Sequence, residues 1–176
     1  VVPSEHFNTV LYNGSGGEQT ITSGFNTDFV WLKRRDGTGN HVLLDKLRLT
    51  NSLPNRLFSN STSAESNAAD GQKEFSSTGI VLDSSGTGGE VNYNGRTYVA
   101  WNWKANGSGS SNTNGSINST VSANTDAGFS IVSYTGTGAN ATVGHGLSKA
   151  PDFLVTKTRS HTGDWMVYYG DNTDFL

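Results

Sequence analysis

Two tryptophan residues separated by one residue, in the segment "RTYVAWNWK" (96–104), have the type and spacing that could bind a ligand. In an extended strand, alternate side chains point to opposite faces, so Trp101 and Trp103 share one face and Asn102 lies on the other. Indole rings stack on the apolar faces of sugar rings, while amide side chains bond the sugar hydroxyl groups. One interpretation of the pattern is a carbohydrate-binding surface, whose candidate ligand-binding residues are Trp101, Asn102, Trp103 and Trp165.

The same strand also has the composition of a core strand in a β-sandwich. Val99, Trp101 and Trp103 are large apolar residues on one face, which such a strand would bury. If the core contains them, Trp101→Ala should lower the free energy of unfolding by on the order of 3–5 kcal/mol. We therefore expect these three side chains to be buried, and solvent-exposed indoles would favour sugar binding instead.

No arrangement typical of an active site or a metal centre is present in the sequence. The four histidines, His6, His41, His145 and His161, lack metal-ligand spacing, and His145 lies between two glycines, as is typical of a turn. The chain has no cysteine, and it has no nucleophile-elbow, zinc-protease or P-loop motif. Asp83–Glu90 gathers hard oxygen ligands of the kind that bind Ca²⁺, but its glycines favour a simple turn. We therefore expect no enzymatic activity, no metal and no cofactor.

The composition favours strands and turns over helices. Asn, Ser, Thr and Gly together make up almost half of the 176 residues, and these residue types favour turns or tolerate strands. The net charge of −3 gives no broad attraction to phosphate groups. No apolar run approaches the ~20 residues that a membrane-spanning helix needs. We therefore expect neither nucleic-acid binding nor membrane insertion.

Short alternating segments between Gly- and Asn-rich turns predict an all-β fold, an antiparallel β-sandwich of jelly-roll or lectin-like type. In the segment 28–34, Phe29 and Trp31 share a face with Lys33, which predicts a strand that begins in the core and ends in solvent. The segment 47–70 has no clean alternation and is expected to be a long loop with one short helical turn. The expected strands are 7–12, 18–22, 28–34, 41–45, 79–82 and 96–104, followed by 116–123, 129–134, 141–143, 152–158 and 164–169.

The chain contains an internal repeat of domain size. "FNTVLYNGSG" (7–16) recurs as "FSIVSYTGTG" (129–138) at a separation of 122 residues. "DFVWLKRR" (28–35) recurs as "DFLVTKTR" (152–159) at a separation of 124 residues. The repeat predicts a tandem duplication in which the second copy is incomplete. The predicted division is a first β-sandwich repeat at 1–105, a Gly/Ser/Asn linker at 106–115 and an incomplete second repeat at 116–176.

Along nearly its whole length, the chain resembles the repeated β-rich modules of large structural proteins in tailed bacteriophages, particularly marine phages. The segments that carry this likeness are "VVPSEHFNTV", "DFVWLKRR", "YVAWNWKA" and "STVSANTDAGFSIVSYTGTGANATVGHGL" followed by "APDF". The resemblance implies a non-enzymatic module of a phage fibre, tail or capsid-decorating protein, located on the virion surface and outside the cell. Its partners would be other virion proteins or copies of itself, with host-surface glycans as a second class of partner. The resemblance provides no catalytic residues.

The second repeat has no match to residues 49–103 and lacks a second "YVAWNWK". So short a half sandwich, ~60 residues, would leave its apolar inner face exposed to water. Three arrangements would cover it: further residues of a longer tandem-repeat protein, packing of the second repeat on the first, or strands lent by a neighbouring subunit. We expect the first, in which this chain is a segment of a longer protein. The side chains that need cover are Phe129, Ile131, Phe153, Val155 and Trp165.

Overall fold

The computed structural model describes residues 1–67, 71–83 and 90–170, and these residues form an all-β protein. Their only helical element is one 3₁₀ turn, η1 (Pro3–Glu5), and none of their helices is long and apolar enough to cross a membrane. Each named strand runs antiparallel to its partners, which confirms the predicted fold class. The strands are β1 (Phe7–Asn13), β2 (Gln19–Thr22), β3 (Phe29–Arg34), β4 (His41–Asp45), β5 (Leu49–Thr50), β6 (Leu53–Pro54), β7 (Leu57–Phe58), β8 (Gln72–Phe75), β9 (Gly79–Leu82), β10 (Thr97–Trp103), β11 (Ser110–Asn112), β12 (Ser119–Asn124), β13 (Phe129–Tyr134), β14 (Phe153–Lys157) and β15 (Trp165–Tyr169).

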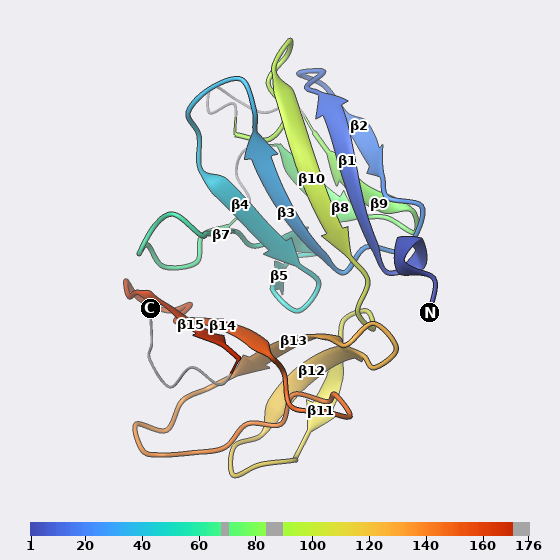
Figure 1. Ribbon diagram of the computed structural model, residues 1–176. Coiled ribbons are helices and arrows are strands. Elements are labelled where there is room, and N and C mark those ends of the chain that lie inside the picture. The colour runs from blue at the N-terminus through green and yellow to red at the C-terminus, as the bar shows by residue number, and fades with distance from the viewer. Residues whose placement is uncertain (68–70, 84–89, 171–176) are drawn as a thin grey trace.

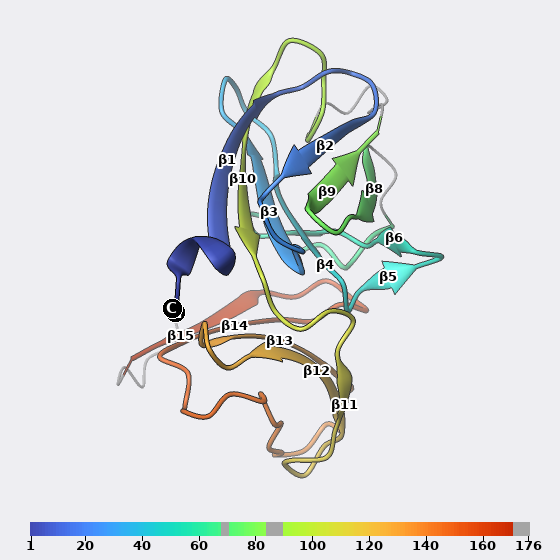
Figure 2. The same cartoon turned by 90° about the vertical axis from the view of Figure 1, so that its right-hand side faces the viewer.

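The first part of the chain forms two sheets that pack face to face (Figures 1 and 2). The larger sheet has the strand order β1-β10-β3-β4-β7, and the smaller has the order β2-β9-β8. Burial of aliphatic side chains between the sheets is the main favourable contribution to folding of this part. The core residues are Ile21, Val30, Leu32, Val42, Leu44, Ile80, Leu82, Val91 and Ala100.

The face of β10 that points into the core is not the expected one. Ala100 and Asn102 are fully buried between the sheets. Trp101 and Trp103 are half-buried on the outer face of the larger sheet, whereas Val99 is buried on that same outer face. The prediction that Val99, Trp101 and Trp103 occupy the core is therefore wrong for both indoles.

Strand β3 shows the same inversion. Val30 and Leu32 are fully buried in the core, while Phe29 and Trp31 are half-buried on the outer face. The expectation that Phe29 and Trp31 begin a core-facing run is therefore also wrong. Facing sheets lie about 10 Å apart, and side chains of aliphatic size fill that space from both sides. The rings of Phe29, Trp31, Trp101 and Trp103 take the outer face, whereas that of Tyr98 is fully buried on the inner face of β10.

The second part of the chain forms the sheets β11-β12-β13 and β14-β15, which lie below the sandwich in Figure 1. The β14–β15 hairpin has the register of the β3–β4 hairpin, displaced by the same 124 residues as the sequence repeat. Tandem duplication stays a prediction. It requires the β14–β15 hairpin to pair as the β3–β4 hairpin does, and the hairpin has this pairing. The equivalent pairs are Phe29 with Asp45 and Phe153 with Tyr169, then Lys33 with His41 and Lys157 with Trp165.

Several segments differ from the sequence-based expectation. Within 47–70, where the structure describes residues up to 67, the chain forms the short strands β5, β6 and β7 in place of a helical turn. The predicted linker 106–115 contains β11, which pairs with β12. The predicted strand 141–143 is reduced to bridges from Val143, and β8 has no counterpart among the expected strands. Short strands with few apolar residues carry too little alternation to be recognised in a sequence.

The second part packs against the first. Phe129 contacts the rings of Trp103 and Phe29, in both cases with 6.0 Å between ring centroids. Glu65 of the first part forms an ion pair with Arg159 of the second. Of the three arrangements expected to cover the second repeat, packing on the first is present in the structure, but it leaves Phe153 and Val155 59% and 42% exposed. Membership of a longer protein stays a prediction.

Candidate functional site

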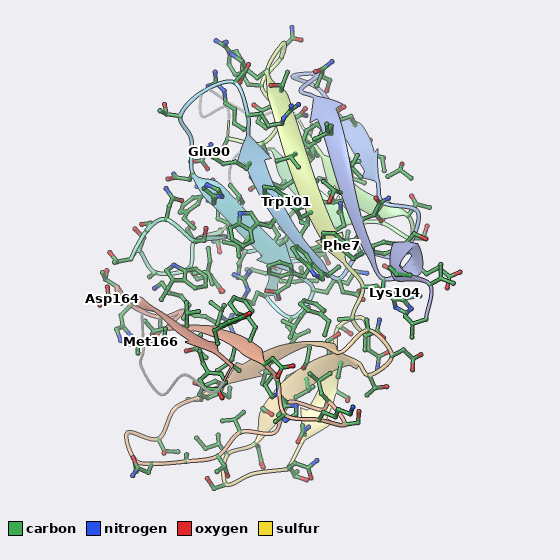
Figure 3. The ribbon with its side chains drawn as sticks, in the orientation of Figure 1. Phe7, Glu90, Trp101, Lys104, Asp164 and Met166 are labelled. Atoms are coloured by element: carbon green, nitrogen blue, oxygen red, sulfur yellow. The ribbon has the colours of Figure 1, made fainter. Side chains whose placement is uncertain are left out.

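The outer face of the larger sheet carries five aromatic side chains, which we name the outer aromatic face. Strand pairing places Trp101 beside Trp31, and Trp103 between Phe7 and Phe29. The rings of Trp101 and Trp31 meet edge to face, with centroids 5.9 Å apart. Figure 3 shows Trp101 on β10 and Phe7 near the lower end of β1. The alternation of the three strands β1, β3 and β10, together with their register, is therefore enough to assemble this cluster.

The polar group of Trp31 is already bonded within the outer aromatic face. Its indole N–H donates to Nδ1 of His41 across 2.9 Å. Burial lowers the pKa of His41, and the positive charge of Lys33 lowers it further. The imidazole is therefore neutral at neutral pH, and its Nδ1 can accept the hydrogen bond from the indole N–H. Trp31 offers an apolar ring to a ligand and no free donor.

A hollow of about 400 Å³ opens where Trp103 meets the second part of the chain. Phe7, Trp103 and Phe129 contribute aromatic walls, and Trp103 stacks on Phe129 with an angle of 22° between the ring planes. His6 and Asp126 add polar groups to the lining. Aromatic walls with a few polar groups are the general form of a small-ligand site.

The structure does not bring Asn102 together with the tryptophans. Asn102 is fully buried on the inner face of β10. Its side-chain amide donates to the carbonyl oxygens of Ala100 and Asn8, at 3.1 and 3.2 Å. The amide therefore stabilises the pairing of β1 with β10, and Asn102 is not placed to bind a ligand beside Trp101 and Trp103.

Trp165 lies apart from the outer aromatic face, in the β14–β15 hairpin. Its indole N–H donates to the carbonyl oxygens of Phe58 and Ser61, at 3.0 and 3.1 Å. These acceptors lie in and just after β7 of the first part. Trp165 therefore holds the hairpin against the first part, and only Trp101 and Trp103 of the four predicted ligand-binding residues share a surface.

Trp101→Ala should lower the free energy of unfolding by about 1 kcal/mol, because a half-buried indole loses only part of the burial that a core residue loses. Urea unfolding followed by circular dichroism measures the difference. Trp101→Phe keeps a ring against Trp31 and serves as the control, with a change within about 0.5 kcal/mol. If Trp101→Ala lowered the free energy of unfolding by ~3 kcal/mol or more, the indole would contribute as a core residue does, which would contradict its place on the outer face.

A network of ion pairs joins the two parts of the chain at Glu65. Arg159 donates from Nε and Nη2 to the two carboxylate oxygens of Glu65, at 2.8 and 2.9 Å. Arg48 donates from Nη1 to the same carboxylate at 3.1 Å and from Nε to Asp45 at 2.6 Å. The side chain of Glu65 is only 11% exposed. A bidentate pair of this kind fixes orientation as well as distance.

The electrostatics of the network keep Glu65 ionised. Burial by itself raises the pKa of Glu65, but the hydrogen bond from Arg159 and the positive charges of Arg48 and Arg159 outweigh it, and the net pKa is below its ordinary value. The hydrogen bond to Glu65 likewise raises the pKa of Arg159, against the effect of burial. At neutral pH the pair therefore connects the two parts as opposite charges.

Sequence reasoning missed Glu65 because it lies in the segment 47–70, which has no recognisable pattern. Arg159 was visible only as the repeat match of Arg35. A signal for Glu65 does exist, since it is the sole carboxylate between Asp45 and Asp70. A lone carboxylate in a segment whose other charges up to residue 69 are Arg48 and Arg56 is a reason to search for its cationic partners.

The β14–β15 hairpin exposes large apolar side chains. Phe153 and Tyr169 are 59% and 68% exposed, and they pair across the hairpin. Met166, labelled in Figure 3, lies on β15. The strand edge of β14 that does not face β15 pairs with no other named strand of the described residues. The full set of exposed apolar residues in this hairpin is Phe153, Leu154, Val155, Met166 and Tyr169.

No cluster of metal-binding side chains is assembled by the residues that the structure describes. Among them, no three His, Asp or Glu side chains come together in a way that could hold a metal ion. His145 accepts a hydrogen bond at Nδ1 from the backbone N–H of Leu147, within its own turn. Most of Asp83–Glu90, the segment with hard oxygen ligands, lies outside the described residues.

Comparison with known proteins identifies one family. A family model described as a domain of unknown function, DUF7483, matches residues 2–174. No curated protein and no solved structure matches the chain.

Proposed function

We propose that this chain, which belongs to the DUF7483 family, is a non-enzymatic structural module of a virion protein. It assembles with other virion proteins or with copies of itself, and it is located on the virion surface, outside the cell. The resemblance of its repeated segments to tailed-phage modules supports the virion assignment. The exposed apolar side chains of the β14–β15 hairpin support a role in assembly.

The single observation that carries the assembly role is the exposure of five apolar side chains on one hairpin, with Phe153, Val155 and Tyr169 on one face and Leu154 and Met166 on the other. Exposed apolar surface on a soluble protein marks an interaction site more often than chance. In the first part, Val30 and Val42 are fully buried. Their equivalents in the β14–β15 hairpin, Leu154 and Met166, are 41% and 44% exposed. The hairpin therefore has the residues of a core strand pair without the opposite layer that covers one.

A second candidate function is carbohydrate binding, and a specific observation favours it. Trp101 and Trp103 lie on the outer face, and Trp103 contributes to the aromatic hollow with Phe7 and Phe129. Exposed ring faces beside polar groups suit sugar rings. Asn102, which the sequence suggested as the hydroxyl partner, is buried, so His6 and Asp126 would take that role.

Cross-linking mass spectrometry on purified particles of the virus that encodes the chain tests the structural role. We expect the chain to be present in the particles, with cross-links to another polypeptide from Lys149 and Lys157, which flank or belong to β14. Lys73, on β8 of the smaller sheet, is the internal control and should link less to other chains. Absence of the chain from particles, or inter-chain links confined to the first part, would refute the proposal.

A glycan array separates the two candidate functions. The labelled chain and its Trp103→Ala variant are applied side by side. Binding that depends on Trp103 would establish the carbohydrate role, and an array without Trp103-dependent binding would reject it.

A further inference from the structure

In the first part of the chain, β10 lies between β1 and β3. It pairs antiparallel with both, so that Trp101 is opposite Thr9 on one side and Trp31 on the other. The larger sheet is continuous only because this strand fills the position between its neighbours. The strand comes from residues far along the chain, about ninety after β1 begins.

The second part repeats the neighbours of β10 without repeating β10. By the sequence repeat, β13 corresponds to β1, β14 to β3 and β15 to β4. Among the described residues, β13 pairs with β12 alone and β14 with β15 alone, and no named strand connects them. β13 and β14, the counterparts of the two strands that flank β10 in the first part, therefore each keep one unpaired edge.

The two open-edged strands lie in the same region of the molecule. Arg159, two residues after β14, donates from Nη1 to the hydroxyl of Ser133 in β13 across 2.8 Å. Figures 1 and 2 both place the β14–β15 hairpin beside β13. Unpaired strand edges present backbone donors and acceptors that template another strand.

We propose that β13 and β14 together bind one extended strand of the β10 type, supplied by a separate polypeptide and antiparallel to both. A β10-type strand is a segment with the residue pattern of 97–103. The inference rests on the proposed assembly function and identifies its partner. Main-chain hydrogen bonds provide the affinity, and the alternating side chains provide the specificity, as in other cases of strand addition.

The residues of β13 and β14 that correspond to the neighbours of β10 indicate which kind of strand would bind between them. On the outer face, the position of Trp101 lies between the counterparts of Thr9 and Trp31, which are Ile131 and Val155. These two side chains are apolar, so an aromatic or other large apolar residue fits between them.

The inner face sets a second requirement on the occupant. The position of Ala100 lies between the counterparts of Val10 and Leu32, which are Val132 and Thr156. A small residue fits between these, and a charged residue there would be left without a partner.

A register-specific disulfide tests the proposal. The chain has no cysteine, so Val155→Cys and, separately, Ile131→Cys each introduce a single thiol. The probe is a synthetic peptide of residues 95–104, "GRTYVAWNWK", with Trp101→Cys. We expect both chain variants to form a disulfide with this peptide under mild oxidation, several times faster than with a peptide that carries Asn102→Cys instead, since that thiol points to the opposite face.

Two controls keep the test decisive. Leu11→Cys places a thiol on β1 of the first part, where β10 is already present, at a position that is 60% exposed against 42% for Val155. This variant should react with the Trp101→Cys peptide no faster than with the Asn102→Cys peptide. Titration of the unmodified peptide into the unmodified chain should shift NMR amide signals in β13 and β14 and leave the first part unchanged. Equal reaction with both peptides, or no shifts, would refute the strand site. If the chain still cross-links to neighbours in particles, the assembly proposal stands without it; if it does not, both are refuted.

Discussion

Replacing Glu65 by glutamine should lower the free energy of unfolding by on the order of 3 kcal/mol at neutral pH, the lower end of the range for breaking a buried ion pair. The substitution keeps the size of the side chain and removes its charge. Arg48, which is buried, would then keep Asp45 as its only carboxylate among the contacts described above, and Arg159 would lose its bidentate partner. Urea unfolding at pH 7 measures the change.

The contribution of Glu65 should also depend on pH. Its pKa is lower in the folded protein than its ordinary value, so the unfolded chain binds the proton more readily. The stabilisation is therefore fully present above the ordinary glutamate pKa and is lost as the pH falls through the lower folded-state pKa. The Glu65→Gln variant should lack this part of the acid sensitivity.

A matched control separates the Glu65 network, in which the side chains of Glu65, Arg48 and Arg159 are 11%, 7% and 40% exposed, from an exposed pair. Glu18 pairs with Lys73 at the surface, where the two side chains are 60% and 39% exposed. Glu18→Gln should change the free energy of unfolding by less than about 1 kcal/mol, because exposed pairs contribute little. If the two substitutions have equal effects, the network at Glu65 does not hold the second part of the chain against the first.

Gly79→Ala should lower the free energy of unfolding by about 3 kcal/mol, the upper end of the usual cost of overpacking. Gly79 begins β9 and pairs with Thr22 of β2. A Cβ at this position would lie 2.0 Å from the carbonyl oxygen of Ile21 and 3.1 Å from the backbone nitrogen of Ser23. Backbone atoms of a paired strand cannot move aside as a flexible side chain can, so the β2–β9 ladder would have to separate.

Gly17→Ala is the control for this substitution. A Cβ at Gly17 would meet nothing within 4 Å, and the residue does not have a positive φ. The variant should unfold at the same urea concentration as the parent or be slightly more stable, by up to about 1 kcal/mol, because alanine restricts the unfolded chain. Thermal or urea unfolding measures the stability of the two variants. If Gly79→Ala were as stable as Gly17→Ala, the close approach of β2 to Gly79 would be contradicted.

Most strands could be predicted because each is a local property of the sequence. The segments 7–12, 41–45 and 129–134 alternate or run apolar between turn residues, and each coincides with a strand to within one residue. Although β2 and β9, which have four residues as β8 does, were predicted as 18–22 and 79–82, the short strands β7 and β8 could not be recognised. Their existence depends on pairing with strands elsewhere in the chain, which local composition does not record.

Composition and alternation are enough to predict an all-β protein and the positions of its longer strands, and residues 28–35 and 152–159 visibly match in sequence. Which face of β3 and β10 is inside depends on the tertiary structure, because alternation defines two faces without saying which one meets the opposite sheet. The tertiary structure also decided that Glu65 meets Arg159 across 94 positions of the chain. Local periodicity is a property of neighbouring residues, whereas burial and ion pairing depend on which distant residues the fold brings within contact distance.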